Sequence, residues 1–181
     1  MHCIETPLKG AFILKPRLFR DQRGYFSETY NRKVFEQLGF SYDFVQDNHS
    51  FSKGIGVIRG LHFQKPPYAQ TKLVWVVKGR IFDVVVDLRR ASQTYGKWFD
   101  IELSAFEMNM ILVPKGFAHG FCTMEEDTVV LYKVDAYYVP DADSGIRWND
   151  PDLSIPWPVP GPILSEKDKQ LPFFREIGLI F

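Results

Sequence analysis

The chain has four histidines, and one of them, His62, stands beside an arginine in the apolar, glycine-bounded stretch GVIRGLHFQ at residues 56–64. A histidine in this setting can be a general base, a metal ligand or a core residue with a hydrogen-bond partner. His119 is the second histidine with informative neighbours, because Pro114 and Gly116 predict a turn that leads into a strand. The role of His62 decides which chemistry the sequence supports.

The spacing P-x-G-x-x-H that ends at His119 is similar to the second motif of the cupin superfamily, which are small β-barrels of the jelly-roll type. In metal-binding cupins the first motif has a histidine pair followed by a glutamate. Here His62 is present, but Gln64 stands at the second histidine and Lys72 lies near the glutamate position. An ammonium group repels a metal ion, and one imidazole does not hold a metal tightly. We therefore expect no metal site and no metal-dependent oxygenase.

Tyr132 is a third residue that could do chemistry. It shares one strand face with Val130 and Val134, because side chains alternate along a strand with a period of two. On an apolar face, a tyrosine is either a core residue with a satisfied hydroxyl or a proton donor in a pocket. These residues alone favour the core interpretation.

Most of the chain predicts strands and turns. Glycine and proline punctuate short β-branched or alternating segments, a pattern typical of an all-β sandwich or barrel. Two β-branched segments, 71–77 and 80–88, are joined by Lys78-Gly79 and predict a hairpin. Further strands are predicted at 97–103, 110–114 and 128–139.

One helix is predicted where Asn31 can cap an apolar stripe that Gly39 ends. The proline-rich segment 149–174 carries apolar side chains that a disordered tail rarely exposes. We expect this segment to pack across the barrel, with SEKDKQL (165–171) as a short helical turn. No repeat, low-complexity tract or linker divides the chain, so residues 1–181 are expected to form one domain.

Composition limits the partners. The 22 Lys and Arg residues balance 22 Asp and Glu, so we expect no binding to nucleic acid or to an anionic membrane. There is no apolar run long enough for a transmembrane helix and no signal-peptide pattern at the N-terminus. Cys3 and Cys122 are the only cysteines, which favours free thiols and the cytoplasm.

Seven segments, in order along the chain, resemble the sugar-nucleotide epimerases typified by dTDP-4-dehydrorhamnose 3,5-epimerase. Together they span roughly residues 1 to 175. The segments are DQRGYFSETYN (21–31), VQDNHS (45–50), VIRGLHFQ (57–64), VPKGFAHGF (113–121), LYKV (131–134), GIRWNDP (145–151) and LSEKD (164–168).

This resemblance implies a cupin-type jelly roll and an isomerase that needs no cofactor. Its substrate would be a 4-keto-6-deoxyhexose on dTDP, inverted at C3 and C5 beside the ketone. His62 would be the base, and Asp168 would orient its ring and stabilise the imidazolium, as carboxylates do in hydrolase triads. Tyr132 would return a proton on the opposite face, and Lys72 would stabilise the enolate oxygen.

The resemblance also implies a set of substrate contacts. Arg23 and Arg59 would hold the diphosphate, because arginine forks suit phosphate oxygens. Tyr138 would stack on thymine. The other implied contacts are Lys72, Glu28, Gln46, Asp47, Asn48, His119, Asp143, Lys167, Phe19 and Phe121. Asp143 departs from the glutamate that the family often has there, which leaves its nucleotide contact open.

Several alternatives remain open at this level. A single-site epimerase at C3 or C5 would use the same residues, and a 3,4-ketoisomerase would not be expected to need Tyr132. A non-catalytic cupin that binds sugar nucleotides would need no acid–base pair. The resemblance further implies a homodimer that exchanges N-terminal strands, with Glu28 reaching the partner's site.

Overall fold

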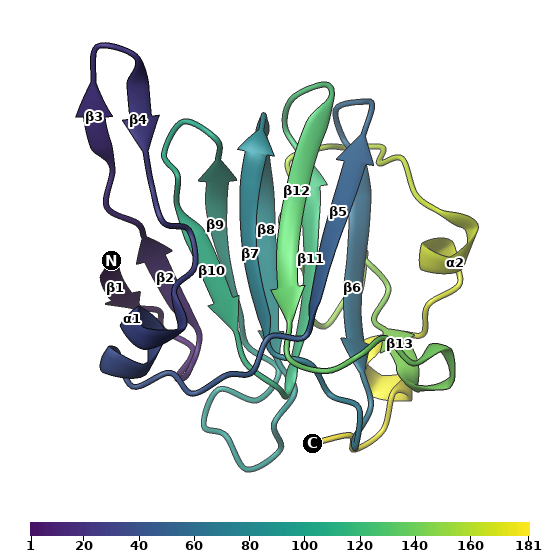
Figure 1. Ribbon diagram of the computed structural model, residues 1–181. Helices are drawn as coiled ribbons and strands as arrows, with labels where there is room; N and C mark the ends of the chain where they lie inside the picture. Colours follow the sequence, from purple (N-terminus) through teal and green to yellow (C-terminus); the bar gives the residue numbers. More distant parts are fainter.

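The computed structural model describes all 181 residues, and Figure 1 shows two antiparallel sheets that face each other. The six-stranded sheet has the order β1 (His2–Glu5), β2 (Phe12–Lys15), β10 (Met110–Val113), β7 (Lys72–Lys78), β12 (Thr128–Val134), β5 (Gln46–Ser52). The five-stranded sheet has the order β13 (Asp143–Gly145), β6 (Ile58–Gln64), β11 (Phe117–Thr123), β8 (Arg80–Asp87), β9 (Trp98–Ser104). This sandwich confirms the predicted all-β class.

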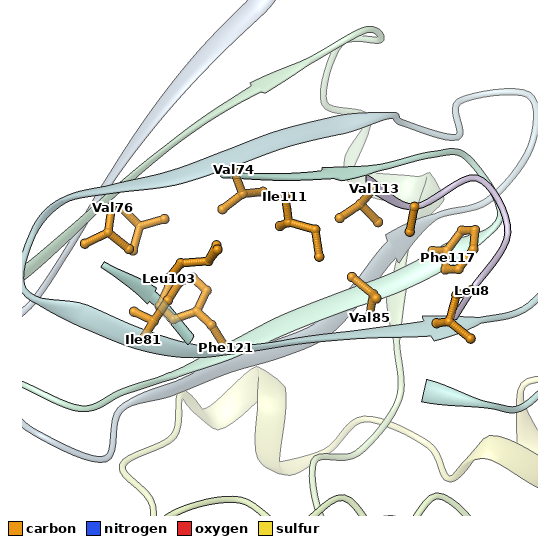
Figure 2. Close-up of a cluster of buried hydrophobic side chains, with 12 residues drawn as sticks. Leu8, Val74, Val76, Ile81, Val85, Leu103, Ile111, Val113, Phe117 and Phe121 are labelled. Carbon is orange, nitrogen blue, oxygen red and sulfur yellow. The ribbon is translucent and has the colours of Figure 1, made fainter. Parts of the chain in front are cut away.

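The two sheets meet in an apolar cluster whose side chains lie between them (Figure 2). It takes Val74 from β7, Val85 from β8, Ile111 from β10 and Phe121 from β11, all with less than a tenth of their surface exposed. Full burial of such side chains contributes about 1.5–3 kcal/mol each. The cluster holds the two sheets together, so that polar side chains on the same strands are held in fixed positions.

The predicted hairpin of β7 and β8 is wrong, although both strands exist. Strand β7 pairs with β10 and β12 in one sheet, whereas β8 pairs with β9 and β11 in the other. The turn at Lys78-Gly79 therefore carries the chain across the sandwich. Gly79 has φ +81°, and a Cβ there would lie 2.5 Å from Oγ1 of Thr128, so a glycine is required.

The two short helices occur where they were predicted. Helix α1 (Arg32–Gln37) is capped by the Asn31 side chain, and Gly39 follows it with φ +86°. Helix α2 (Glu166–Lys169) begins at Ser165. Two 3₁₀ turns lie at Pro140–Ala142 and Phe174–Glu176. None of the helices is long and apolar enough to cross a membrane.

The proline-rich segment packs as expected. Leu153 and Ile155 are buried against β6 and β8, and Trp157 packs beside them. The indole N–H of Trp157 donates to the carbonyl of Trp148 at 2.7 Å. The segment thus covers the outer face of the five-stranded sheet and delivers α2 to the edge of β6. The strand predicted at 128–139 is shorter, since β12 ends at Val134.

A small hairpin, β3 (Phe19–Asp21) and β4 (Gly24–Phe26), stands away from the sandwich (Figure 1). Its apolar side chains have little cover in this subunit: Phe19 is 48%, Tyr25 50% and Phe26 66% exposed. Three large aromatics exposed on one hairpin are unusual for a monomeric protein.

Candidate active site

A cavity of about 420 Å³ opens between the β5–β12–β7 side of one sheet and β6 and β11 of the other, with the α2 segment along its rim. It forms where the inward positions of these strands change from apolar to polar. It brings together eight of the predicted site residues: Arg59, His62, Lys72, His119, Phe121, Tyr132, Lys167 and Asp168.

His62 and Asp168 form a hydrogen-bonded pair in this cavity. The ring Nε2 of His62 lies 2.7 Å from Oδ1 of Asp168, whose side chain is only 4% exposed. Burial opposes ionisation of Asp168, but hydrogen bonds from His62, the backbone of Gly60 and Ser165 hold its pKa below the usual value. The ionised carboxylate is an acceptor only, so Nε2 carries the hydrogen and Nδ1 of a neutral ring is free to accept a proton.

The chain folds back over a long distance to make this pair. The backbone at Ile163 bonds to both Gly56 and Ile58, with N–H to O distances of 2.8 and 3.0 Å. Helix α2 then starts at Ser165, whose hydroxyl accepts from the N–H of Asp168 at 3.1 Å. The carboxylate therefore points to β6 from a helix that is tied to the start of that same strand.

Glycine at position 60 permits this geometry. Gly60 has φ +130°, and a Cβ would lie 2.6 Å from Cα of Gly120 on the neighbouring strand. The strands β6 and β11 approach closely here, and the pairing register shifts between His119 and Phe121. The N–H of Gly60 also donates to Oδ2 of Asp168 at 3.4 Å.

Tyr132 and Lys72 reach the cavity from the opposite sheet. Tyr132 lies on β12 between the buried Val130 and Val134, as the alternation predicted. Burial raises the pKa of Tyr132, which keeps the phenol protonated at neutral pH. Burial lowers the pKa of Lys72 to about 8, so its amine is still mainly charged at pH 7. The imidazole and the phenol thus line one cavity from facing sheets.

A second cavity adjoins the first and shares His62, Lys72, Tyr132 and Lys167 with it. It adds four more of the predicted contacts: Gln46, Asn48, Tyr138 and Asp143. The side chain of Asp143 accepts a hydrogen bond from the Tyr138 hydroxyl at 2.8 Å and pairs with Lys167. The shorter aspartate therefore stays in the site and links β13 to α2.

Arg59 and His119 have fixed surroundings in the first cavity. The guanidinium of Arg59 donates to Oγ of Ser52 at 3.1 Å and to the carbonyl of Phe51 at 2.9 Å. His119 lies directly opposite His62 in the β6–β11 register and bonds to Asp83. Both side chains add positive charge or hydrogen-bond donors near the His62–Asp168 pair.

Four predicted contacts lie outside both cavities in this subunit. Asp47 is on the outer face of β5, paired with Lys133 at 2.7 Å, because it alternates with Gln46 and Asn48. The others belong to the N-terminal arm. Phe19 and Glu28 border a separate small cavity, and Arg23 is paired with Asp21 on the exposed hairpin.

Sequence reasoning missed two polar residues of the site. Ser50 lines the first cavity, and its buried hydroxyl has no hydrogen-bond partner. The alternation that places Gln46 and Asn48 inward also places Ser50 inward, so its position was predictable. Asp83 lies behind His119 and carries no sequence signal, because it sits within a run of apolar strand residues.

The residues around His62 do not form a metal-binding group. No three His, Cys, Asp or Glu side chains converge as metal ligands would. Gln64, at the position of the second cupin histidine, is 3% exposed and uses its amide to bind the backbone carbonyls of Tyr68 and Tyr137 at 2.7 and 3.1 Å. Its role is to hold the loop that carries Tyr138.

Comparison with known proteins gives a consistent result. A family model described as dTDP-4-dehydrorhamnose 3,5-epimerase matches residues 5–176. The curated enzyme of that name from Methanothermobacter thermautotrophicus is 48% identical over 176 residues, which are 96% of this chain and 94% of the relative.

Solved structures agree with this match. The Bacillus anthracis str. Ames dTDP-4-dehydrorhamnose 3,5-epimerase, solved with TDP and PPi bound, has a TM-score of 0.94 at 57% identity, over 95% of this chain and 98% of that chain. The Legionella pneumophila dTDP-6-deoxy-D-glucose-3,5-epimerase, in complex with dTDP-4-keto-L-rhamnose, has a TM-score of 0.93 at 39% identity, over 97% and 94%. These likenesses confirm the predicted cupin-type fold. The chain belongs to the dTDP-4-dehydrorhamnose 3,5-epimerase family.

Proposed function

We propose that this chain converts dTDP-4-dehydro-6-deoxy-D-glucose to dTDP-4-dehydro-L-rhamnose by inverting C3 and C5, a step in dTDP-L-rhamnose biosynthesis. One observation carries the proposal: His62, backed by Asp168, and Tyr132 line one cavity from facing sheets. Inversion beside a ketone needs a base on one face of the sugar ring and an acid on the other. A protein that only binds sugar nucleotides needs neither.

The chemistry can be assigned to named atoms. Nδ1 of His62 takes the proton from the carbon beside the ketone, and the electron pair of the broken C–H bond moves onto the carbonyl oxygen. Lys72 stabilises this enolate, and one such donor is typically worth about 3 kcal/mol of barrier. Tyr132 then donates its proton to the opposite face of the carbon. Solvent resets the imidazolium and the phenolate, and the same groups serve the second carbon.

Deuterium from solvent is expected at both C3 and C5 of the product. Each inversion replaces a carbon-bound hydrogen by one that comes through Tyr132, whose hydroxyl exchanges with water. The test is incubation of the protein with dTDP-4-keto-6-deoxyglucose in deuterated water, with label read by NMR at each carbon.

The rivals give other labelling patterns. Label at one carbon would support a single-site epimerase. No label at either carbon would refute the proposal and leave a 3,4-ketoisomerase or a binding protein. A boiled sample controls for spontaneous exchange beside the ketone.

We also propose that the active form is a homodimer in which the N-terminal hairpin completes the partner's site. The exposed aromatics of β3 and β4 support this, since they need a surface to cover them. Phe19, Arg23 and Glu28 lie outside the cavity of their own subunit, as residues that serve a second subunit would. Arg23 would add positive charge for the diphosphate, which a chain of net charge zero must supply locally.

Mixed dimers test the shared site. His62→Ala and the double variant Arg23→Ala/Glu28→Ala are each expected to be nearly inactive alone. Produced together, they should recover about a quarter of wild-type activity, because roughly half of the dimers are mixed and each contains one intact site.

A control pair separates complementation from other effects. Mixing His62→Ala with Asp168→Asn should recover nothing, because both changes lie on the same side of the site. Sedimentation should show a dimer at micromolar concentration. A monomer, or no recovery in the first mixture, would contradict the proposal.

The cytoplasm is the proposed location of this reaction. Cys3 and Cys122 are free thiols, and Cys122 is buried. Unpaired cysteines are typical of proteins that work in a reducing compartment.

A further inference from the structure

The proposed reaction gives no role to Asp83, a buried carboxylate that lies next to the cavity. Asp83 lies on β8 between Ile81 and Val85, two members of the apolar cluster, and its side chain is 0% exposed. An ionised carboxylate in such a place is costly unless nearby positive charge and hydrogen bonds compensate it. The identity of those compensating groups indicates what Asp83 does.

The compensating groups are two residues of the cavity. Oδ2 of Asp83 lies 2.8 Å from Nε2 of His119, while Oδ1 has no hydrogen-bond partner within the protein. The second group is Lys72, whose ammonium is favoured by the Asp83 charge. Both His119 and Lys72 line the cavity, whereas Asp83 does not. Asp83 therefore acts on the site through a hydrogen bond to His119 and through the effect of its charge on Lys72.

The Asp83 bond fixes the tautomer of His119. A carboxylate accepts and does not donate, so Nε2 of His119 must carry a hydrogen. This leaves Nδ1 as the ring nitrogen that can meet a ligand. The arrangement repeats that of His62 on the neighbouring strand, whose ring bonds to Asp168 through Nε2 at 2.7 Å. The cavity thus has two histidines, each held by a buried carboxylate.

We propose that Asp83 is a positioning residue for the reaction: its hydrogen bond at 2.8 Å fixes the ring of His119 toward the substrate. The negative charge of Asp83 also favours the ammonium form of Lys72 in the same cavity. The inference rests on the proposed function, because His119 and Lys72, the two cavity residues that Asp83 affects, are assigned to the substrate and to the enolate oxygen. An uncharged Lys72 would not stabilise the negative charge on that oxygen.

The charge on Lys72 depends on a balance of neighbours. Burial lowers its pKa to about 8, the carboxylates of Asp143 and Asp83 raise it, and Lys167 lowers it. The other titratable or charged groups around the same cavity are Arg59, His62, His119, Tyr132 and Asp168. Because the pKa of Lys72 is close to neutral pH, the loss of one nearby carboxylate reduces the fraction of Lys72 that is charged at the working pH.

Asp83→Asn is expected to move the alkaline limb of kcat downward by about 1 pH unit, because the ammonium form of Lys72 then loses its proton at lower pH. Asp83→Glu, which keeps the charge, should restore most of the shift. The matched control is Asp87→Asn. Asp87 is on the same strand and equally buried, but it bonds to Arg89, Ser92 and Thr94, away from the cavity. Its loss should lower stability and leave the alkaline limb in place.

A second measurement needs no variant and no turnover. Nitrogen-15 NMR of the wild-type imidazoles should show His119 with its hydrogen on Nε2. A hydrogen on Nδ1 of the neutral ring would overturn the proposal, even if Asp83→Asn does not fold. An unshifted alkaline limb in folded Asp83→Asn would also overturn it. If the wild-type protein fails to turn over the keto-sugar, the proposed function is refuted instead. The NMR result does not depend on turnover, so the two failures can be told apart.

Discussion

His62→Ala is expected to lower kcat by about 10⁴-fold while the protein stays folded. The imidazole combines a free basic nitrogen with an orienting carboxylate, because Nε2 is bonded to Asp168 and Nδ1 is available, and it shares the cavity with the Tyr132 phenol. The fold should survive, since the core contacts of β6 come from the neighbouring Leu61 and Phe63, and His62 itself is 30% exposed. Turnover of the keto-sugar and the circular dichroism spectrum are the two measurements.

A histidine on the six-stranded sheet provides a matched control. His49 is exposed on β5 and lines neither cavity, so His49→Ala should keep wild-type turnover. Full activity in folded His62→Ala would remove the base from the proposed mechanism. Loss of activity in both variants would point to a general effect of removing an imidazole.

The sequence predicted residues that share the first cavity, because His62, Tyr132 and Asp168 lie in segments that resemble the family and Lys72 follows the segment that holds His62. His62, Lys72, Tyr132 and Asp168 come from four separate segments, and the structure brings all four to one cavity. No local sequence pattern predicts that β6 and α2 are in contact. That contact depends on the backbone ladder at Ile163 and on the packing of the proline-rich segment, which are long-range features.

The errors have the same physical origin. The segments of β7 and β8 have the composition of a hairpin, and only the packing of two sheets shows that the turn between them crosses the sandwich. Asp83 was not predicted as a site residue, because the sequence shows only a carboxylate within an apolar strand. Its function becomes visible only when its partner, His119, is located in the structure. Pairing between strands is set by tertiary contacts, so single-sequence patterns predict strands better than they predict neighbours.

The N-terminal arm shows what one subunit does not explain. Its aromatic and charged residues match the family motifs, yet they lie outside the cavity that they are predicted to serve. The proposed exchange of the arm between two subunits would account for this placement. The conflict between motif and position therefore supports the shared-site proposal and makes the mixed-dimer experiment decisive.

Tyr132→Phe is expected to lower formation of the inverted product by about 10²–10⁴-fold, the usual contribution of a positioned acid. The ring remains and so does its packing between Val130 and Val134, so only the hydroxyl is lost. His62 can still remove the proton and return a hydrogen to the same face. In deuterated water, the recovered substrate should therefore gain label without inversion, which NMR measures separately from product.

This split between exchange and inversion distinguishes a proton donor from a structural tyrosine. A variant that had only lost packing would lose exchange and inversion together. Tyr137→Phe is the matched control, because Tyr137 is 68% exposed and lines neither cavity, and it should behave as wild type. Full inversion by Tyr132→Phe would remove Tyr132 as the acid, whereas full turnover to a product that is not inverted would favour the 3,4-ketoisomerase. Since burial raises the pKa of the Tyr132 phenol, the donor stays protonated across the neutral range, and the defect of Tyr132→Phe should persist across that range.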